Sequence, residues 1–256
     1  MQMEFSLIRQ VIGVAYTYPS SGAVRHRLAA TRPDHSSHHR DFSYFRKVES
    51  SEDIVRNMGS LRLRRHPETG AEIRHWSEPE LAILLGHNHH ILAYCLANDF
   101  TAAEIELQSL ASGEDPTHQG KCWKGSVSLG PRFFTPEEIG DDGILEIGFR
   151  IQRGAITVFD GTYNTKSRLR SFVELPQLIV DYYLWLLDLH GSFSALPASK
   201  RIIIEQHSLP EGTVILAGSG IIKVNETYNT RVGDQVTIYS RSIGELTNPI
   251  DSGELK

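Results

Sequence analysis

Ser77-Glu78-Pro79-Glu80-Leu81-Ala82-Ile83-Leu84-Leu85 is the stretch that decides the fold. Its apolar second half predicts a buried strand, and its first half carries two glutamates two residues apart. Side chains i and i+2 of a strand point to the same face, so Glu78 and Glu80 are expected side by side. Neighbouring carboxylates repel, and each is costly to bury alone. A shared divalent cation resolves both problems, whereas a solvated strand end is the plainer alternative for so short a motif.

A third carboxylate strengthens the metal hypothesis. Asp99 follows Glu80 by nineteen residues, within Ala97-Asn98-Asp99-Phe100. The turn signal at residues 86–89 predicts a hairpin, whose second strand would return Asp99 toward the two glutamates. Three carboxylates form the oxygen-rich site that Mg²⁺ or Mn²⁺ prefers. We therefore predict that Glu78, Glu80 and Asp99 bind one such ion.

Composition places the chain among globular proteins. It has 256 residues, of which 40% are hydrophobic and 22% charged, and its net charge of −5 does not suggest a nucleic-acid surface. Two cysteines, Cys95 and Cys122, make no disulfide framework and are typical of a reducing compartment. No early segment has the apolar core of a signal peptide, and no apolar run approaches a membrane span. We expect a cytoplasmic protein that does not bind membranes.

The rest of the chain alternates short strands with few helices. Strands are expected over residues 12–18, 42–46, 61–65, 78–85, 90–96, 144–152, 155–159, 213–216, 235–239 and 243–250. A short helix is predicted over residues 101–110, and a longer one from Pro176 to His190 has an apolar face and a stop at Gly191. This mixture predicts a β-rich α+β fold, as a single domain over residues 1–256. Residues 19–45 include a long irregular stretch and are predicted to act as a lid.

The order of the motifs resembles that of the fumarylacetoacetate hydrolase superfamily. The residues that carry the resemblance are Glu78-Pro79-Glu80-Leu81, Ala97-Asn98-Asp99, Lys121, Leu129-Gly130-Pro131, Gly218-Ser219-Gly220, Gly233-Asp234 and Ile243-Gly244-Glu245-Leu246-Thr247-Asn248-Pro249. The resemblance implies the mixed β-sandwich roll of the C-terminal domain of that superfamily. It also implies a bound Mg²⁺ or Mn²⁺ and a homodimer.

Within the superfamily, the chain most resembles the 2-keto-3-deoxy sugar-acid dehydratases. The similar features are the short spacing from Glu80 to Asp99, Ile105-Glu106, the ungapped stretch from Lys121 to Pro131, Asp160 to Thr165, Arg170-Ser171-Phe172 and Gly218-Ser219-Gly220-Ile221. There are also departures. Ala103 stands where an arginine is frequent, Lys124 where an acidic residue is common and Ser219 where threonine is usual. The segment from Asp99 to Lys121 is longer than in that branch.

The resemblance also suggests roles for individual residues. Lys121 becomes a candidate electrostatic partner or proton shuttle, although a loop lysine is by default a surface residue. Glu106 is a candidate base or outer ligand, and a helix-surface glutamate is the alternative. Gly218, Ser219 and Thr165 are expected to bind the substrate carboxylate, with strand-end capping as the competing interpretation. Lid candidates for the base are His26, His35, His38, His39 and Glu49.

These features predict a divalent-metal-dependent lyase, a dehydratase of a small 2-oxo acid such as a 2-keto-3-deoxy sugar acid. A metal-stabilised enolate would serve loss of a C4 hydroxyl after proton removal at C3. The same activation would serve a C–C bond hydrolase of an acylpyruvate or fumarylpyruvate type, which is the alternative. A third possibility is an altered family member that binds a ligand without turnover, since function belongs to the site and not to the fold.

Overall fold

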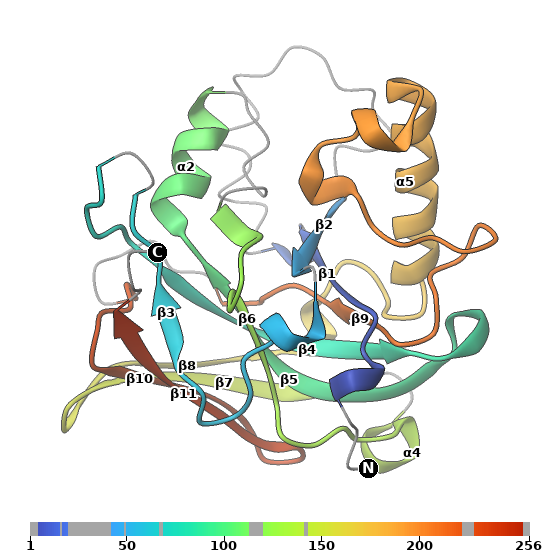
Figure 1. The fold of residues 1–256 in the computed structure, drawn as a ribbon. Coiled ribbons are helices and arrows are strands. Elements are labelled where there is room, and N and C mark those ends of the chain that lie inside the picture. Colours follow the sequence, from blue (N-terminus) through green and yellow to red (C-terminus); the bar gives the residue numbers. More distant parts are fainter. Residues whose placement is uncertain are drawn as a thin grey trace.

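Two β-sheets pack against each other in the computed structural model, which describes residues 5–15, 17–19, 42–48, 50–66, 69–112, 120–140, 143–221 and 228–252 (Figure 1). The six-stranded sheet has the order β2 (Ser43–Val48), β1 (Gln10–Ala15), β9 (Thr213–Leu216), β4 (Trp76–Leu85), β5 (Ile91–Thr101) and β6 (Val127–Leu129). The five-stranded sheet has the order β3 (Leu61–Leu63), β11 (Gly244–Ser252), β10 (Asp234–Ser240), β7 (Glu146–Arg153) and β8 (Ile156–Asn164). This architecture confirms the predicted β-rich α+β fold.

Among the residues that the structure describes, the helices are few and lie outside the sheets. They are α2 (Ala103–Ser112), α4 (Pro136–Ile139) and α5 (Leu175–His190), and short 3₁₀ turns occur at Phe5–Leu7, Ser51–Asp53, His87–His89, Thr165–Ser167, Phe193–Ala195 and Ala198–Lys200. Helix α5 packs on β2, where Tyr182 meets the rings of Phe42 and Tyr44 edge to face. Among the described residues, no helix is both long and apolar enough to cross a bilayer.

The hairpin of β4 and β5 is the centre of the larger sheet. Its register pairs Glu78 with Asp99 at the open end, and Leu85 pairs with Ile91 near the turn. Strand β9 flanks β4 and strand β6 flanks β5, so both members of the hairpin are interior strands. All ten residues of β4 are buried, which excludes the solvated strand end considered as an alternative for the two glutamates. A strand buried on both faces accounts for the near-continuous apolar run after Glu80.

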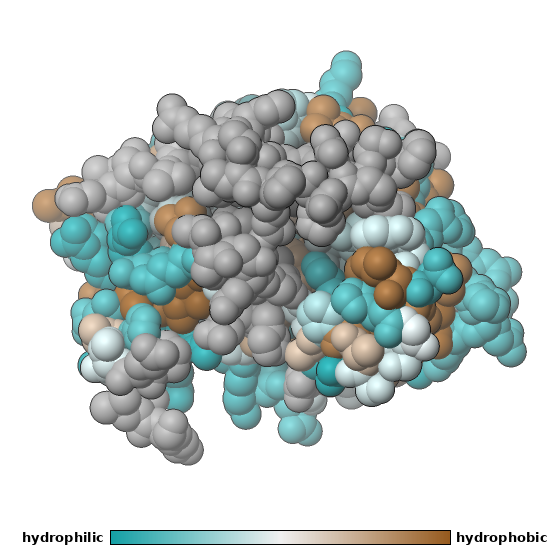
Figure 2. All heavy atoms as spheres, turned by 90° about the horizontal axis from the view of Figure 1, so that it is seen from above, coloured by the Kyte–Doolittle hydropathy of each residue, from teal (hydrophilic) through white to brown (hydrophobic). Residues whose placement is uncertain are grey.

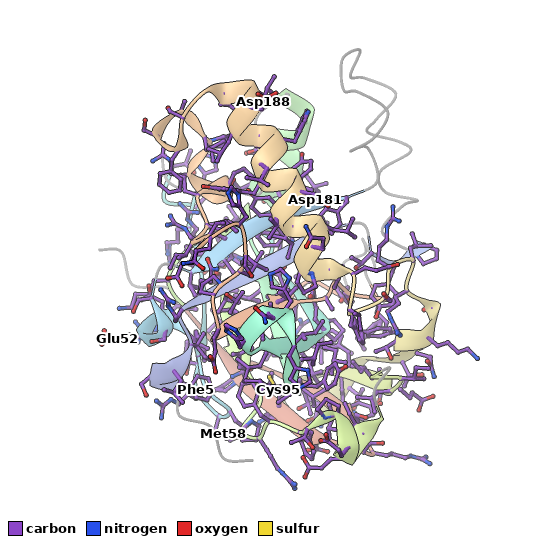
Figure 3. The ribbon with its side chains drawn as sticks, turned by 90° about the vertical axis from the view of Figure 1, so that its right-hand side faces the viewer. Phe5, Glu52, Met58, Cys95, Asp181 and Asp188 are labelled. Carbon is purple, nitrogen blue, oxygen red and sulfur yellow. The ribbon has the colours of Figure 1, made fainter. Side chains whose placement is uncertain are left out.

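The six-stranded sheet is rolled, because strands far apart in its order come together. Lys47 on β2 forms an ion pair with Asp99 on β5, and the backbone of Val55, just after β2, bridges to Ser128 on β6. Alternate residues of each strand therefore face the inside of the roll. This interior contains Val11, Ala82, Leu84, Ala93, Cys95, Ala97, Val127, Leu129, Val214 and Leu216, all buried. Figure 3 shows Cys95 among the strands, whereas Asp181 and Asp188 lie along α5.

The opposite face of the roll forms the main core. Ile12, Ile83 and Leu96 of the larger sheet pack there with Phe149 and Ile238 of the smaller sheet. Because side chains alternate along a strand, β4 gives Leu81, Ile83 and Leu85 to this core and turns Glu78, Glu80, Ala82 and Leu84 into the roll. The two carboxylates therefore lie on the same face as small apolar side chains.

Most predicted elements are present, and several differ at their ends; β5, for example, extends to Thr101 and β8 to Asn164. Strand β1 ends at Ala15, so Thr17 and Tyr18 are buried but do not belong to the strand predicted over 12–18. The helix predicted over 101–110 begins at Ala103, because Thr101 still pairs with Trp76 in the sheet. Of the predicted lid over 19–45, residues 43–45 belong to β2, and residues 20–41 lie outside the described residues.

A glycine of β1 allows an aromatic ring to lie across the inside of the roll. A methyl group at Gly13 would lie 2.2 Å from Cζ of Phe45, its cross-strand partner. We predict that Gly13→Ala lowers the free energy of unfolding by about 1–3 kcal/mol through overpacking, as measured by urea denaturation. The matched control is Gly161→Ala on the edge strand β8, where the nearest atom is Cζ of Phe159 at 3.1 Å, and we expect a much smaller loss because a small shift of that ring relieves the contact. Equal losses for the two variants would contradict this packing argument.

Candidate metal centre

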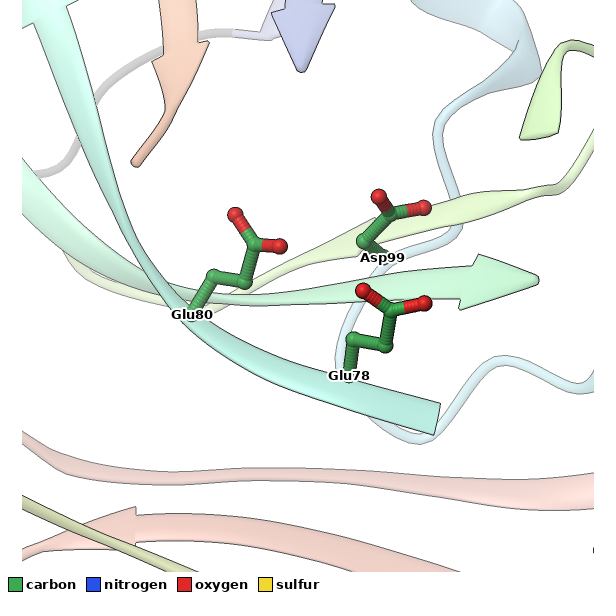
Figure 4. Close-up of side chains that lie close together, drawn as sticks. All are labelled: Glu78, Glu80 and Asp99. Carbon is green, nitrogen blue, oxygen red and sulfur yellow. The ribbon is translucent and has the colours of Figure 1, made fainter. Parts of the chain in front are cut away.

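Three carboxylates converge inside the roll. Glu78 and Glu80 project from β4 and Asp99 from β5, and each offers an oxygen atom that lies within 4.8 Å of those of the other two (Figure 4). All three are almost completely buried, with exposed fractions of 6%, 1% and 1%. The strand register produces this arrangement, because Glu78 lies directly opposite Asp99 and Glu80 follows on the same face. The structure therefore assembles the three predicted ligands.

Two buried lysines contact two of these carboxylates. Nζ of Lys121 donates to Oε1 of Glu78 at 2.8 Å, to Oδ2 of Asp99 at 3.1 Å and to Oγ1 of Thr101 at 2.9 Å. Nζ of Lys47 donates to the other oxygen of Asp99 and, at 3.1 Å, to the carbonyl of Phe100. Both oxygens of Asp99 are thus paired with ammonium groups, and the predicted site residue Lys121 lies against two of the carboxylates.

The charge on Glu80 is balanced less well. Burial, followed by repulsion from Asp99 and Glu78, raises the pKa of Glu80 well above its usual value, and the Gly218 N–H, 2.7 Å from Oε2, opposes the rise. Burial would also raise the pKa of Asp99, but Lys121 and Lys47 outweigh it and lower that pKa. The protein alone therefore stabilises the ionised form of Glu80 poorly. A divalent cation would stabilise that ionised form, and an all-oxygen donor set fits Mg²⁺ or Mn²⁺.

Lys121 reaches the centre because the neighbouring Gly120 packs tightly on helix α2. The carbonyl of Gly120 accepts a hydrogen bond from the Ala102 N–H at 2.8 Å, and a methyl group at Gly120 would lie 2.8 Å from Cβ of Glu106. Glu106 lies in the first turn of α2 and is partly buried. Burial raises its pKa to about 7, Lys121 opposes the rise, and Glu78 and Asp99 add to it. The carboxyl of Glu106 is therefore within electrostatic reach of the centre.

The three residues expected to bind substrate make contacts within the protein. Oγ1 of Thr165 donates to the Gly143 carbonyl and accepts from the Leu145 N–H, both at 2.8 Å. Oγ of Ser219 donates to the carbonyl of Ile221 at 2.9 Å and accepts from its N–H at 3.2 Å. These bonds match the capping alternative for both hydroxyls. Gly218 instead touches the centre directly through its N–H to Glu80.

Lys47 and Thr101 are the contacts that the sequence analysis missed. Lys47 contacts Asp99 across 52 positions of sequence, and only closure of the roll brings the two together. Lys47 lies two residues after the buried Phe45, so strand alternation turns both side chains to the same face. The strand predicted over 42–46 ended before Lys47, whereas β2 continues to Val48. Thr101, two residues after Asp99 on the same strand, donates to Oε1 of Glu78 at 2.7 Å. The i, i+2 rule that singled out the glutamates would also have found it.

The sequence departures lie at different distances from the centre. Ala103 is completely buried in the main core, so this position supplies no charge to the site. Lys124 is 82% exposed and lies 3.5 Å from a carboxylate oxygen of Asp53, outside the cluster.

The lid candidates His26, His35, His38, His39 and Glu49 fall outside the described residues. Seen from above, the described surface mixes hydrophilic with smaller hydrophobic groups (Figure 2).

Sequence comparisons agree with the motif order. The family described as fumarylacetoacetate (FAA) hydrolase C-terminal matches residues 54–183, just over half of the chain. A probable 2-keto-3-deoxyxylonate dehydratase of Haloferax volcanii is 29% identical over 175 residues, which are 68% of this chain and 50% of that protein. A 2-dehydro-3-deoxy-D-arabinonate dehydratase of Saccharolobus solfataricus is 27% identical over 175 residues, which are 68% of this chain and 48% of that protein. The chain spans about half the length of these relatives.

Solved structures show the same fold. A 2-keto-3-deoxy-D-arabinonate dehydratase complexed with magnesium and 2,5-dioxopentanoate has a TM-score of 0.68 and 21% identity, over 97% of this chain and 74% of that one. The region that matches the family contains the hairpin of β4 and β5, the three carboxylates and Lys121. The chain therefore belongs to the fumarylacetoacetate hydrolase C-terminal family.

Proposed function

We propose that the protein is a divalent-metal-dependent dehydratase of a 2-keto-3-deoxy sugar acid. The observation that carries the proposal is the buried set of Glu78, Glu80 and Asp99, whose oxygen atoms lie within 4.8 Å of one another. The names of the two relatives support the reaction type, and the magnesium bound in the similar arabinonate dehydratase complex supports the metal.

The donor set defines what the cofactor does. Glu78, Glu80 and Asp99 would hold Mg²⁺ or Mn²⁺, which polarises the keto and carboxylate oxygens of a 2-oxo acid and makes the C3 proton more acidic. The protein would exclude water from this reaction, because all three ligands are buried inside the roll. A low-dielectric site makes each charge interaction stronger than in water.

Lys121 acts as a permanent cation in this proposal. Burial would lower its pKa, but Asp99, Glu106 and Glu78 raise the pKa of Lys121 well above its usual value, so the side chain stays protonated. A lysine in that state is a poor base and a good electrostatic partner for developing negative charge. Of the two roles that the sequence left open, the contacts favour electrostatic partner over proton shuttle.

Glu106 has the properties of the proton carrier. With a pKa raised to about 7 by burial, its carboxyl can accept and release a proton near neutral pH. In dehydration it would take the C3 proton and give it to the hydroxyl that leaves C4, so the C4–O bond breaks and water departs. One residue can then balance both proton transfers, and no external acid is needed.

The proposal extends to assembly and location. We expect a homodimer in the cytoplasm, built from one domain per chain, with a small 2-oxo acid as its partner. These expectations follow from the family and from the composition.

The reaction can be tested directly. We predict that purified protein with Mg²⁺ removes water from 2-keto-3-deoxyarabinonate or 2-keto-3-deoxyxylonate, detected by mass spectrometry as a product lighter by one water. Lys121→Met should lower kcat at least about 100-fold, because one preorganised charge at the reacting group contributes that much. Lys124→Met, outside the cluster, is the matched control and should retain activity. Release of pyruvate from acylpyruvates without dehydration would favour the C–C hydrolase, and metal binding without either activity would favour the altered family member.

Metal binding can be measured without turnover. We predict that the protein binds one Mn²⁺ per chain, by titration calorimetry or electron paramagnetic resonance, and that Mn²⁺ raises its melting temperature. Glu80→Gln should weaken the Mn²⁺ affinity by about tenfold or more, because loss of a metal ligand lowers the affinity at least as much as loss of a group that orients a ligand. Glu146→Gln on the exposed end of β7 controls for loss of a carboxylate. Unchanged Mn²⁺ affinity in Glu80→Gln would exclude this metal centre.

The raised pKa of Glu106 predicts a pH dependence of stability. The folded protein holds the Glu106 proton more tightly than the unfolded chain, so this stabilisation is present below about pH 4.5 and is lost as the pH rises to about 7. Glu106→Gln lacks this titration. Denaturation in a chelator should therefore show the variant gaining stability relative to the wild type between about pH 4.5 and 7, with a constant difference above about pH 8. A difference that does not vary with pH would argue against a buried, titrating Glu106.

A further inference from the structure

One peptide group connects a threonine of the N-terminal segment to the metal ligand Glu80. Oγ1 of Thr17 donates to the carbonyl of Ala217 at 2.7 Å. The N–H of the same peptide unit belongs to Gly218 and donates to Oε2 of Glu80 at 2.7 Å. A hydroxyl and a carboxylate, separated by 63 residues of sequence, thus bind opposite ends of one peptide dipole.

The residues of this relay are closely fitted. Gly218 has φ of +86°, and a methyl group there would lie 2.0 Å from Oγ1 of Thr17. Thr17 and Ala217 are buried, with exposed fractions of 2% and 1%. Glycine is therefore required by backbone conformation and by contact with the threonine. Thr17 is thus a buried side-chain donor to the carbonyl of this peptide, beside the backbone bond from the Ala217 N–H to the Leu81 carbonyl at 3.0 Å.

Thr17 is itself held in place from a second direction. Its carbonyl accepts a hydrogen bond from the Leu169 N–H at 2.6 Å. The next residue, Tyr18, packs edge to face on Tyr163 with ring centres 5.4 Å apart. The hydroxyl of Tyr163 donates at 2.9 Å to the carbonyl of Pro79, the residue between the two glutamates. Thr17 is thus connected to the side chain of Glu80, and Tyr18 is connected through Tyr163 to the backbone of Pro79.

We propose that Thr17 is a positioning residue for the metal centre, which orients Glu80 through the Ala217–Gly218 peptide. The inference rests on the proposed role of Glu80 as a metal ligand. Hydrogen bonds in a chain polarise one another, so the Thr17 hydroxyl strengthens the bond from the Gly218 N–H to the carboxylate. Outer groups of this kind alter metal affinity by about 10–100-fold when they are removed.

The decisive variant is Thr17→Val, which keeps the shape of the side chain and removes the donor. We expect Mn²⁺ affinity, measured by titration with the metal alone, to fall about tenfold. Thr17→Ser keeps the hydroxyl and should stay within about twofold of the wild type by the same reasoning. Melting temperatures of the metal-free proteins separate this effect from general destabilisation.

A matched control exists on β9. The hydroxyl of Thr213 is also buried and donates to a backbone carbonyl, that of Pro210, at 2.7 Å, but it does not contact the metal centre. Thr213→Val should lower the melting temperature as Thr17→Val does and leave Mn²⁺ affinity unchanged. If Thr17→Val does not fold, Thr17→Ala compared with Thr17→Ser measures the same loss of a hydroxyl.

The outcomes distinguish two kinds of failure. Weaker Mn²⁺ binding in Thr17→Val, with recovery in Thr17→Ser, would support the positioning role. Unchanged affinity in Thr17→Val, while Glu80→Gln binds Mn²⁺ weakly, would overturn this inference and leave the metal centre intact. Unchanged affinity in both variants would overturn the metal centre itself.

Discussion

Repulsion among buried carboxylates is the constraint on which the rest of the structure depends. Two like charges about 4 Å apart repel by roughly 4 kcal/mol at the effective dielectric constant of about 20 that suits proteins. Three such pairs would cost on the order of the whole net stability of a domain, about 5–15 kcal/mol. Lys47 and Lys121 offset part of this cost through Asp99 and Glu78. Neither lysine forms an ion pair with Glu80, so a bound cation would stabilise the ionised form of this side chain most.

The inward face of the β4–β5 hairpin has an apolar end and a charged end. At the turn end of the hairpin, Ala82, Leu84 and Cys95 fill the interior. At the open end, Glu78 and Asp99 replace them on the same face. Small side chains suit the inside of a small roll, where opposing strands leave little space. The ligands are therefore set on rigid strands whose other face is anchored in the main core.

Local patterns predicted the ligands, whereas closure of the roll determined their surroundings. Glu78 and Glu80 follow from strand alternation, and Asp99 from the hairpin, so a few residues of sequence were sufficient. Lys47 on β2 contacts Asp99 across 52 positions, and Thr17, which follows β1, contacts Ala217 across 200 positions. No local period specifies such contacts. Thr165 is a different case, because the resemblance suggested that its hydroxyl binds substrate. In the structure this hydroxyl bonds to backbone groups 20 and 22 positions away, as the capping alternative expects.

The position of Ala103 bears on what the proposed site would accept. Ala103 is buried in the core and brings no charge to the centre. Among the described residues, Lys47 and Lys121 are the lysines that contact the carboxylates. Lys47 is committed to Asp99 and the Phe100 carbonyl, so its charge is balanced within the protein. Lys121 shares its ammonium among Glu78, Asp99 and Thr101, and metal binding to those carboxylates would weaken their hold on it. A substrate with one carboxylate matches a centre that offers one divalent ion and one such lysine. Metal binding would thus leave Lys121 as the cation that the described residues bring to the single carboxylate of the proposed 2-keto-3-deoxy sugar acid.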